Sequence, residues 1–371
     1  MKGVGRYAWN LAEQMDRLLG NEYEILLLHF EGERVEFSPN FGGILLPIKK
    51  MTETRFGLIE LKRIVSDHKP VVLIRPSDAI GVDYGVPTLT VCHDLNPLIW
   101  AAQASRPWRY CIVDIVKEYF RGHAMRNSEL VICNSNFVLD AVAKYFNLDR
   151  SRMTVAPCGI DARLIEISDS IDCDHVRRRF SGSKGLAGFL LTFATGDTRE
   201  GFDILPTFWE KTVEAGYEGA LVIAGVKETE KYAKTVKDEF SARSYAERVV
   251  WLPFLDQSRI SDLAGLYTAA DFYLEFSKHE GFGMQLAEAM ACGTVCFSTG
   301  CGGLDEVGGG LTLPLVGDPA VDGYAVAKAW REGRHTGHRE IVSEHARKFT
   351  WDTAGLAASN FVRAKNKTKW P

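Results

Sequence analysis

The 371-residue sequence lacks the features that mark several specialised protein classes. Its eight cysteines include no CxxC pair, and Cys292, Cys296 and Cys301 have no histidine at metal-ligand spacing, which argues against a zinc site. The net charge of −4 gives no basic field for nucleic acid. No run approaches the ~20 apolar residues of a membrane span, and the opening residues contain no signal-peptide core. We therefore expect a cytoplasmic protein with free thiols, no metal ion and no nucleic-acid partner.

Short apolar runs alternate with longer amphipathic stretches along the chain. Runs of this length with polar boundaries predict buried parallel strands, and the stretches between them have helical spacing. Strand–helix alternation in two blocks predicts an α/β protein with two parallel-sheet domains. The predicted strands are 24–30, 71–74, 88–94, 130–135 and 153–157 in the first block, and 188–196, 220–225, 249–254, 271–277 and 294–299 in the second.

A polar stretch separates the two blocks. Residues 169–185 are polar and contain glycine near their end, which is typical of a linker. We therefore assign residues 1–168 to the first domain and residues 186–348 to the second.

The first helical stretch, residues 5–19, begins almost at residue 1. A parallel α/β domain normally places a strand and a glycine-rich loop before its first helix. Gly3 and Gly5 supply the loop, but no strand precedes them. We expect the first sheet to lack a central strand, with the N-terminus truncated or wrongly assigned.

The stretch EGFGMQLAEAMACG, residues 280–293, places two carboxylates eight positions apart around a glycine-containing turn. It follows a predicted strand, and open α/β sheets bind ligands beyond the carboxyl ends of their strands. The helix N-terminus after the turn favours an anion such as phosphate. Glu280 and Glu288 could accept hydrogen bonds from the hydroxyls of a sugar and a ribose. One capping and one solvated glutamate would explain the spacing equally well.

Residues 277–307 resemble the E-x7-E motif of the retaining GT-B glycosyltransferases of family 4. Residues 90–98, 130–161 and 262–277 are also similar to segments of that family. The likeness covers nearly the whole chain apart from the first strand. It implies two Rossmann-like domains that face each other across a cleft, with residues 349–371 forming a C-terminal helix that packs back toward the first domain.

The resemblance also implies an activity. Family members transfer a sugar from a nucleotide-diphosphate donor, here a UDP- or GDP-sugar, to a glycan or lipid-linked acceptor with retention of configuration and without a metal. Mannosyl or glucosyl transfer in polysaccharide or glycolipid biosynthesis is the expectation. Such chemistry needs positioning and charge stabilisation of the leaving diphosphate more than a protein nucleophile.

The same likeness implies roles for individual residues. Glu280 and His93 would contact the donor sugar, and Glu288 would hold the ribose hydroxyls. Outside this motif, a histidine at a strand end is more often structural. The implied donor-binding residues are Gly3, Gly5, Arg199, Phe282, Gly283, Met284 and Glu288, and the implied catalytic residues are His93 and Glu280.

One segment departs from the family pattern. Where members carry a diphosphate-binding lysine before glycine, this chain has Glu200 within FATGDTREGFDIL, residues 193–205. A carboxylate facing a diphosphate would repel it. Arg199 could supply the missing charge, because its planar guanidinium suits phosphate. A different donor or weak activity would also account for the change.

Three other interpretations fit parts of the sequence. A dehydrogenase fingerprint at residues 3–8, with Glu31 as the ribose-binding acid, needs a preceding strand that is absent. A GT-B sugar-nucleotide epimerase is disfavoured by the E-x7-E pattern, whereas a non-catalytic GT-B scaffold stays open because of Glu200.

The basic, aromatic stretch 105–126 contains Arg109 and Arg121, and it could contact the inner face of an anionic membrane or be an ordinary amphipathic helix.

Overall fold

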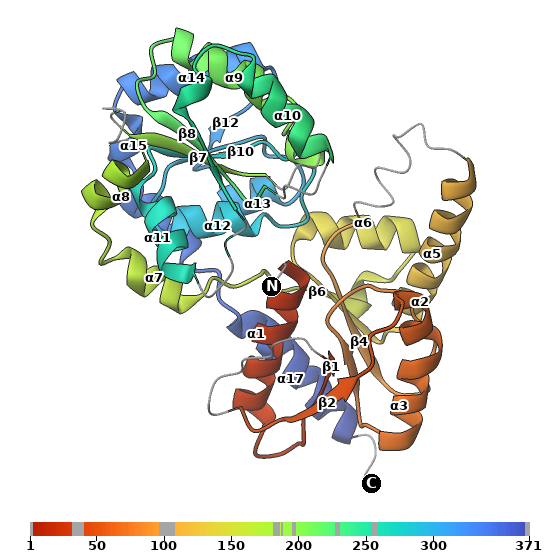
Figure 1. The fold of residues 1–371 in the computed structure, drawn as a ribbon. Helices are drawn as coiled ribbons and strands as arrows, with labels where there is room; N and C mark the ends of the chain where they lie inside the picture. The colour runs from red at the N-terminus through yellow and green to blue at the C-terminus, as the bar shows by residue number, and fades with distance from the viewer. Residues whose placement is uncertain are drawn as a thin grey trace. The chain divides into compact units, whose positions relative to one another are not determined.

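The chain forms two compact units (Figure 1). The computed structural model describes residues 3–31, 41–95, 108–180, 186, 188–194, 198–226, 231–253, 255 and 259–367. Unit 1 comprises Met1–Gly159 with Thr350–Pro371, and unit 2 comprises Ile160–Phe349. Every strand pair within the described sheets is parallel. This is the two-domain α/β architecture that the sequence predicts.

Unit 1 contains two separate sheets, one with the order β1-β2 and one with the order β3-β4-β5-β6. All five residues of β4 are buried, as expected for a parallel strand with both faces covered. Its elements are α1 (Gly3–Leu19), β1 (Leu26–Phe30), β2 (Ile44–Ile48), α2 (Glu53–Arg55), the π-helix η1 (Phe56–Glu60), α3 (Leu61–His68), β3 (Leu73–Arg75), β4 (Thr88–Cys92), α5 (Trp108–Asn127), β5 (Leu130–Cys133), α6 (Asn136–Phe146), the 3-10 helix η2 (Arg150–Arg152), β6 (Met153–Val155) and α17 (Asp352–Lys367).

Unit 2 is built on a single parallel sheet with the order β12-β11-β10-β7-β8-β9. Trp209, Phe240 and Phe272 lie in its buried core. Its elements are α7 (Ala162–Ser168), α8 (Cys173–Phe180), β7 (Phe189–Phe193), η4 (Thr198–Glu200), α9 (Leu205–Glu214), β8 (Ala220–Ala224), α10 (Lys231–Ser241), η5 (Ala246–Arg248), β9 (Val249–Leu252), α11 (Ile260–Ala269), β10 (Phe272–Glu275), α12 (Met284–Ala291), β11 (Cys296–Ser298), α13 (Leu304–Gly308), β12 (Leu313–Pro314), α14 (Pro319–Arg331), α15 (Arg334–Gly337) and α16 (Arg339–Ala346).

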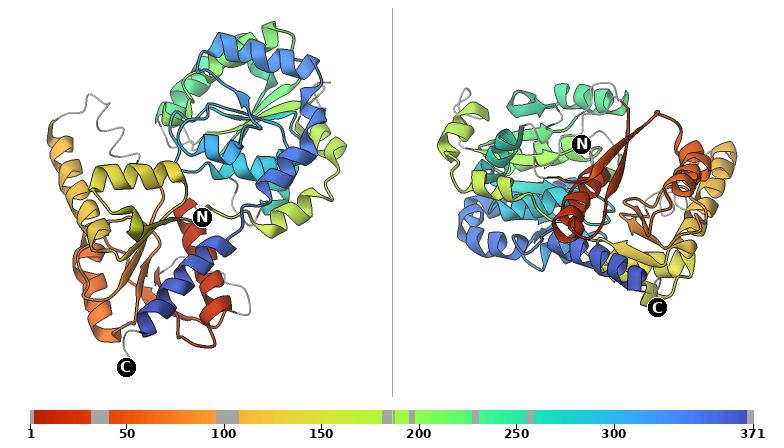
Figure 2. Two further views of the ribbon diagram at one scale, coloured as in Figure 1. Left: turned by 180° about the vertical axis from the view of Figure 1, so that it is seen from behind. Right: turned by 90° about the horizontal axis from the view of Figure 1, so that it is seen from below.

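The C-terminal helix α17 belongs to unit 1 and lies along α1 (Figures 1 and 2). The two helices approach closely, because a Cβ atom on Gly355 would stand 2.6 Å from Cβ of Gln14. Arg363 at the far end of α17 donates to the Leu18 carbonyl at 3.0 Å and to Glu22 at 2.6 Å. Residues from both ends of the chain thus complete one unit.

The strand predictions agree with the structure in all but two places. Every predicted apolar run contains or overlaps an observed strand. The sequence analysis did not predict β2, which contains Pro47, or the two-residue β12. Proline is tolerated in β2 because this strand is at the edge of its sheet, where one side needs no hydrogen-bond donor.

The division between the units differs from the predicted one. It falls at Gly159/Ile160, and residues 173–180 of the predicted linker form helix α8 inside unit 2. Arg177 of α8 donates to the Ala269 carbonyl at 3.0 Å and lies 3.5 Å from the Asp271 carboxylate. A polar surface helix anchored by an arginine has the same composition as a linker, so composition alone could not separate the two.

Candidate active site

The turn that carries Glu280 packs against a second glycine-containing loop of unit 2. Gly303 donates its N–H to the Glu280 carbonyl at 2.8 Å, and a β-bridge joins Glu280 to Gly302. A Cβ atom on Gly302 would stand 2.3 Å from the Glu280 carbonyl oxygen, and one on Gly303 would stand 2.1 Å from the Gly281 carbonyl oxygen. Glycine is therefore required at 302 and 303 so that the two backbones can touch.

Gly283 ends this turn and begins helix α12. Its φ of 96° lies in the left-handed region, and a Cβ atom would stand 2.4 Å from Cδ2 of Leu304. Phe282 is 5% exposed, and its ring meets that of Phe349 edge-on at 5.5 Å. The phenyl group thus anchors the turn. Only the backbone of Phe282 is then left to form a hydrogen bond with a ligand. Met284, half-buried, is the first residue of α12.

Glu280 lies near Arg199, which the sequence analysis names as a candidate donor-binding residue. Its Oε1 is 3.8 Å from Nη1 of Arg199, and both side chains are about one-quarter exposed, at 27% and 24%. The carbonyl of Arg199 accepts from the N–H of Lys278 at 2.8 Å, which fixes η4 against the turn. The fold therefore brings together an acid and a base that are far apart in sequence.

Glu288 is buried, with 2% of its surface exposed. Its Oε2 accepts a hydrogen bond from the Tyr267 hydroxyl at 3.0 Å. A buried carboxylate needs such a donor, and Tyr267 on α11 supplies it. The sequence analysis missed Tyr267, because no local pattern links it to α12.

Glu200 stands at the end of η4, close to the buried Glu275. Burial raises the pKa of Glu275, hydrogen bonds from Ser277 and Tyr273 oppose the rise, and the charge of Glu200 adds to it. Tyr273 donates to Glu275 at 2.9 Å. This end of β10 therefore holds two carboxyl groups near each other, and the charge of Glu200 favours the neutral form of Glu275. A negative charge on Glu200 would disfavour an anion bound beside it.

His93 follows β4 in unit 1 and is held in one tautomer. Its Nε2 lies 2.8 Å from the Pro76 carbonyl, and because a carbonyl only accepts, Nε2 carries the proton. Burial lowers the pKa of His93. The imidazole is thus kept neutral near pH 7, with Nδ1 as an acceptor. Asn134 Nδ2 donates to the His93 carbonyl at 2.9 Å.

Two aromatic rings complete the surroundings of His93. Tyr7 of α1 is fully buried, and its ring meets His93 edge-on at 4.9 Å and Trp351 at 5.2 Å. Burial raises the pKa of Tyr7 well above its ordinary value. The sequence analysis placed Gly3 and Gly5 in a loop before the first helix. The structure places both residues in the first turn of α1.

Arg121 of α5 lies in the interior of unit 1. Its side chain is 12% exposed, forms an ion pair with Asp78 and donates to the Asp94 carbonyl at 2.7 Å. Burial lowers the pKa of Arg121 to about 10. Arg121 therefore does not belong to an exposed basic face. Arg109 and the start of the 105–126 stretch lie outside the residues whose side chains are described.

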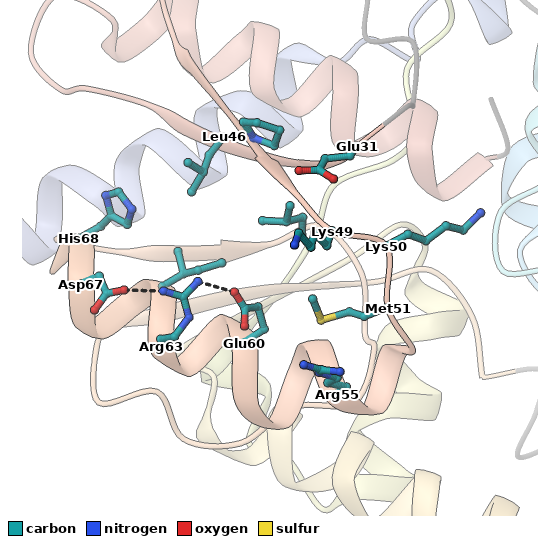
Figure 3. A pocket seen from close by; sticks show the side chains of 13 residues that line it. Glu31, Leu46, Lys49, Lys50, Met51, Arg55, Glu60, Arg63, Asp67 and His68 are labelled. Carbon is teal, nitrogen blue, oxygen red and sulfur yellow. Dashed lines mark hydrogen bonds and ion pairs between the residues drawn. The ribbon is translucent and has the colours of Figure 1, made fainter.

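A cavity of about 590 Å³ lies in unit 1 between β2 and α3 (Figure 3). Arg63 spans its floor between Glu60 at 2.5 Å and Asp67 at 2.9 Å. Lys49 and Lys50 also line it. The cavity has mixed charge, and none of the residues that the glycosyltransferase resemblance assigns to the site lines it. Glu31, the acid of the rival dehydrogenase fingerprint, does line it.

Two family matches cover most of the chain. Residues 1–164 match glycosyltransferase family 4, and residues 178–309 match glycosyl transferases group 1. The chain belongs to the GT-B glycosyltransferases of group 1. The second match contains Glu280 and the whole of α12.

Two curated relatives of this glycosyltransferase have different names. It is 27% identical over 259 residues to a mannosylfructose-phosphate synthase of Agrobacterium fabrum, a match that covers 66% of this chain and 55% of that relative. It is 24% identical over 386 residues to the O-antigen chain mannosyltransferase B of Escherichia coli, covering 97% and 95% of the two chains. The chain thus spans about half the length of the first relative and nearly all of the second.

Solved structures share the fold of this glycosyltransferase. A glycosyltransferase from Rickettsia africae superposes with a TM-score of 0.70 at 12% identity over 96% of this chain and 94% of that one. Anabaena HepE in complex with UDP and glucose superposes with a TM-score of 0.66 at 17% identity over 100% and 96%. At these identities the likeness shows the GT-B fold alone.

The described residues contain neither a candidate membrane span nor a candidate metal cluster. No helix among them combines the length and the apolar character needed to cross a membrane. Within the same part of the glycosyltransferase, no three His, Cys, Asp or Glu side chains gather as a metal site would require.

Proposed function

We propose that this glycosyltransferase moves a hexose from a UDP- or GDP-sugar to a glycan or lipid-linked acceptor, with retention of configuration and without a metal ion. The observation that carries the proposal is the arrangement at the start of α12. There Glu280 and Arg199 stand 3.8 Å apart beside a left-handed glycine turn. A relative named as a mannosyltransferase, and a fold shared with a protein solved in complex with UDP and glucose, support a nucleotide sugar as donor.

The residues of unit 2 have complementary parts in this scheme. The N–H groups at the start of α12 and the Arg199 guanidinium offer positive charge to the diphosphate, both before and after the glycosidic bond breaks. Glu280 accepts hydrogen bonds from sugar hydroxyls and so orients the anomeric carbon. Glu288, oriented by Tyr267, is assigned to the ribose hydroxyls.

His93 of unit 1 supplies a different chemistry. Its neutral ring offers Nδ1 as a hydrogen-bond acceptor, and its Nε2 proton is already committed to Pro76. We propose that Nδ1 accepts from a hydroxyl of the donor sugar. This role needs a neutral imidazole, which burial maintains by lowering the pKa. Gly3 and Gly5, at the start of α1, are proposed to line the diphosphate.

Incubation with a panel of UDP- and GDP-sugars tests the proposal, because water can replace the acceptor in a slow hydrolysis. Release of nucleoside diphosphate from at least one donor, undiminished by EDTA, is expected. Proton NMR should show the released sugar first in the anomeric configuration of the donor. Inversion would refute retention, and an isomerised nucleotide sugar would identify an epimerase.

A non-catalytic scaffold is the second candidate, favoured by the negative charge of Glu200 beside Glu275. A scaffold would release no nucleoside diphosphate and would show no shift of melting temperature with any donor.

A further inference from the structure

Strand β10 of unit 2 ends in an acid, although its other three residues are Phe, Tyr and Leu. It lies between β7 and β11 in the sheet, and every one of its residues is buried. Glu275 itself is 7% exposed. Burial of an ionised carboxylate is costly unless a cation pairs with it, and a carboxyl group in such a place tends to bind a proton instead.

Glu275 has hydrogen-bond donors around it but no cation. Its Oε2 accepts from the Tyr273 hydroxyl at 2.9 Å, and its Oε1 accepts from the N–H of Ser277 at 3.2 Å. In the part of unit 2 that the structure describes, no lysine, arginine or histidine forms an ion pair with it. The charge that acts on Glu275 is that of Glu200, which has the same sign. Two neighbouring carboxylates repel each other, and a proton on one of them removes the repulsion.

The backbone on both sides of Glu200 is fixed against the end of β10. On one side, the carbonyl of Arg199 accepts from the N–H of Lys278 at 2.8 Å. On the other side, a Cβ atom on Gly201 would stand 2.6 Å from Cβ of Phe276 and 2.7 Å from its carbonyl oxygen. The φ of Gly201 is 67°, a left-handed conformation that favours glycine. Backbone packing therefore keeps η4 beside the residues that follow Glu275.

The other ionisable groups around Glu275 do not balance its charge. Burial raises the pKa of Tyr273 and of Cys296 on β11 well above their ordinary values, so both are neutral near pH 7. Strand β7, on the other side, has no ionisable side chain, and Tyr267 of α11, whose ring meets that of Tyr273, donates to Glu288. The cations at this end of the strand have acidic partners of their own, with Arg199 3.8 Å from Glu280 and Lys278 3.1 Å from Asp203.

We propose that Glu275 is a positioning residue of the donor site, which takes up a proton from solvent when a nucleotide-diphosphate sugar binds beside η4. This inference rests on the proposed function, because the bound diphosphate supplies the additional negative charge. That charge favours the neutral form of Glu275, as the charge of Glu200 and burial already do in the free protein. A protonated Oε2 keeps its contact with Tyr273, because a hydroxyl can accept as well as donate. The diphosphate then meets one carboxylate at this end of β10 instead of two.

Calorimetric titration of UDP-glucose and GDP-mannose between pH 5.5 and pH 7.5 tests the proposal. The diphosphate of both donors is esterified at each end, so its charge is constant over this range. Glu275→Gln imitates the protonated form, and His93 is present in both proteins. The affinity of the wild type relative to that of Glu275→Gln should therefore rise about tenfold from pH 7.5 to pH 5.5. The binding heat of the wild type should also change with the ionisation enthalpy of the buffer, which reports proton uptake, whereas that of Glu275→Gln should not.

Asp322 of α14 provides the matched control. It is a second buried carboxyl group of unit 2, its pKa is raised by burial, and it accepts from the N–H groups of Val316 and Gly317. Asp322→Asn should therefore change stability but keep the pH dependence and the proton uptake of the wild type.

A measurement without donor tests the proton on Glu275 directly. Because its pKa is raised in the folded state, the stabilisation that the proton gives is present at low pH and is lost as the pH rises through that pKa. The melting temperature of Glu275→Gln relative to the wild type should therefore increase from pH 5 to pH 8. Donor binding with the same pH dependence in the wild type and Glu275→Gln, and without proton uptake, would overturn this inference and leave the proposed function intact. Absence of donor binding by all three proteins at every pH would refute both.

Discussion

At the residue scale, charge decides how the candidate site works. Arg199 is the cation that the structure places beside Glu280, whereas Glu200 adds negative charge near Glu275. The two neighbours on η4 would thus have opposite effects on a diphosphate bound as we propose. Each effect can be measured separately, because donor affinity responds to charge at the site more than to net charge.

Charge reversal at Glu200 should strengthen donor binding. Glu200→Lys removes a repulsion and adds an attraction, so we expect affinity for the preferred nucleotide sugar to rise about tenfold, or ~1.4 kcal/mol. Glu214→Lys on α9 is the matched control, because it changes net charge equally at a residue paired with Lys211 on the surface. Equal gains in both variants would mean that Glu200 has no local role.

Loss of the Glu280 carboxylate should weaken donor binding without unfolding unit 2. Glu280→Gln keeps the size of the side chain but removes a charged acceptor, which contributes about 1.5–3 kcal/mol to a hydrogen bond. We expect a 10- to 100-fold weaker donor affinity and a change of less than ~1 kcal/mol in the free energy of unfolding, because the ion pair with Arg199 is partly exposed. Calorimetric titration and chemical denaturation measure the two quantities.

His93 should make stability depend on pH. Its pKa is lowered in the folded state, so the unfolded chain binds the proton more tightly and stability falls as pH drops below 6.5. Gln can still donate to the Pro76 carbonyl but does not titrate. Between pH 7 and pH 5, the melting temperature of His93→Gln should therefore fall less than that of the wild type. Parallel losses in the two proteins would show that His93 is not buried as described.

At the element scale, the turn 280–283 depends on the loop that packs against it. The backbones of Glu280 and Gly281 touch Gly302 and Gly303, so this backbone contact holds the turn in shape together with the buried ring of Phe282. Glycine at 302 and 303 therefore lets the two backbones touch. Glycine at 283 allows the left-handed backbone conformation of the residue before α12.

A single methyl group at Gly303 tests this dependence. Gly303→Ala places Cβ 2.1 Å from the Gly281 carbonyl oxygen, so the loops must separate. We expect a loss of about 1–3 kcal/mol in unfolding free energy and weaker donor binding. Gly337→Ala on α15, where no atom lies within 4 Å of the new Cβ, is the control and should be neutral or slightly stabilising. An unchanged donor affinity in Gly303→Ala would show that the shape of the turn does not affect donor binding.

Most strands could be predicted from the sequence because buried parallel strands are continuous apolar runs. β2 could not, since Pro47 and its exposed edge position disguise it, and α8 could not, because its polar face resembles a linker. The carboxylates Glu280 and Glu288 could be selected from a short motif. Arg199 could be selected as a donor-binding candidate, but neither its pairing with Glu280 nor the contact of Tyr267 with Glu288 could be predicted, because these contacts join elements brought together only by the fold.

At the scale of the whole molecule, both units are parallel α/β folds that differ in how their strands are divided among sheets. The described strands of unit 2 form one six-stranded sheet, whereas those of unit 1 form a two-stranded and a four-stranded sheet. Trp351, at the return of the chain to unit 1, packs on Tyr7, which in turn contacts His93. The position of His93 therefore depends on Tyr7 of α1 and on Trp351 as well as on its own strand.

The central claim is that the turn before α12 binds a nucleotide-diphosphate sugar, and calorimetric titration of UDP- and GDP-sugars against wild type and Glu288→Gln tests it most directly. We predict saturable binding of at least one donor to the wild type, and at least tenfold weaker binding to the variant at an unchanged melting temperature. Absence of binding by every donor, or equal affinity of the two proteins, would contradict the claim.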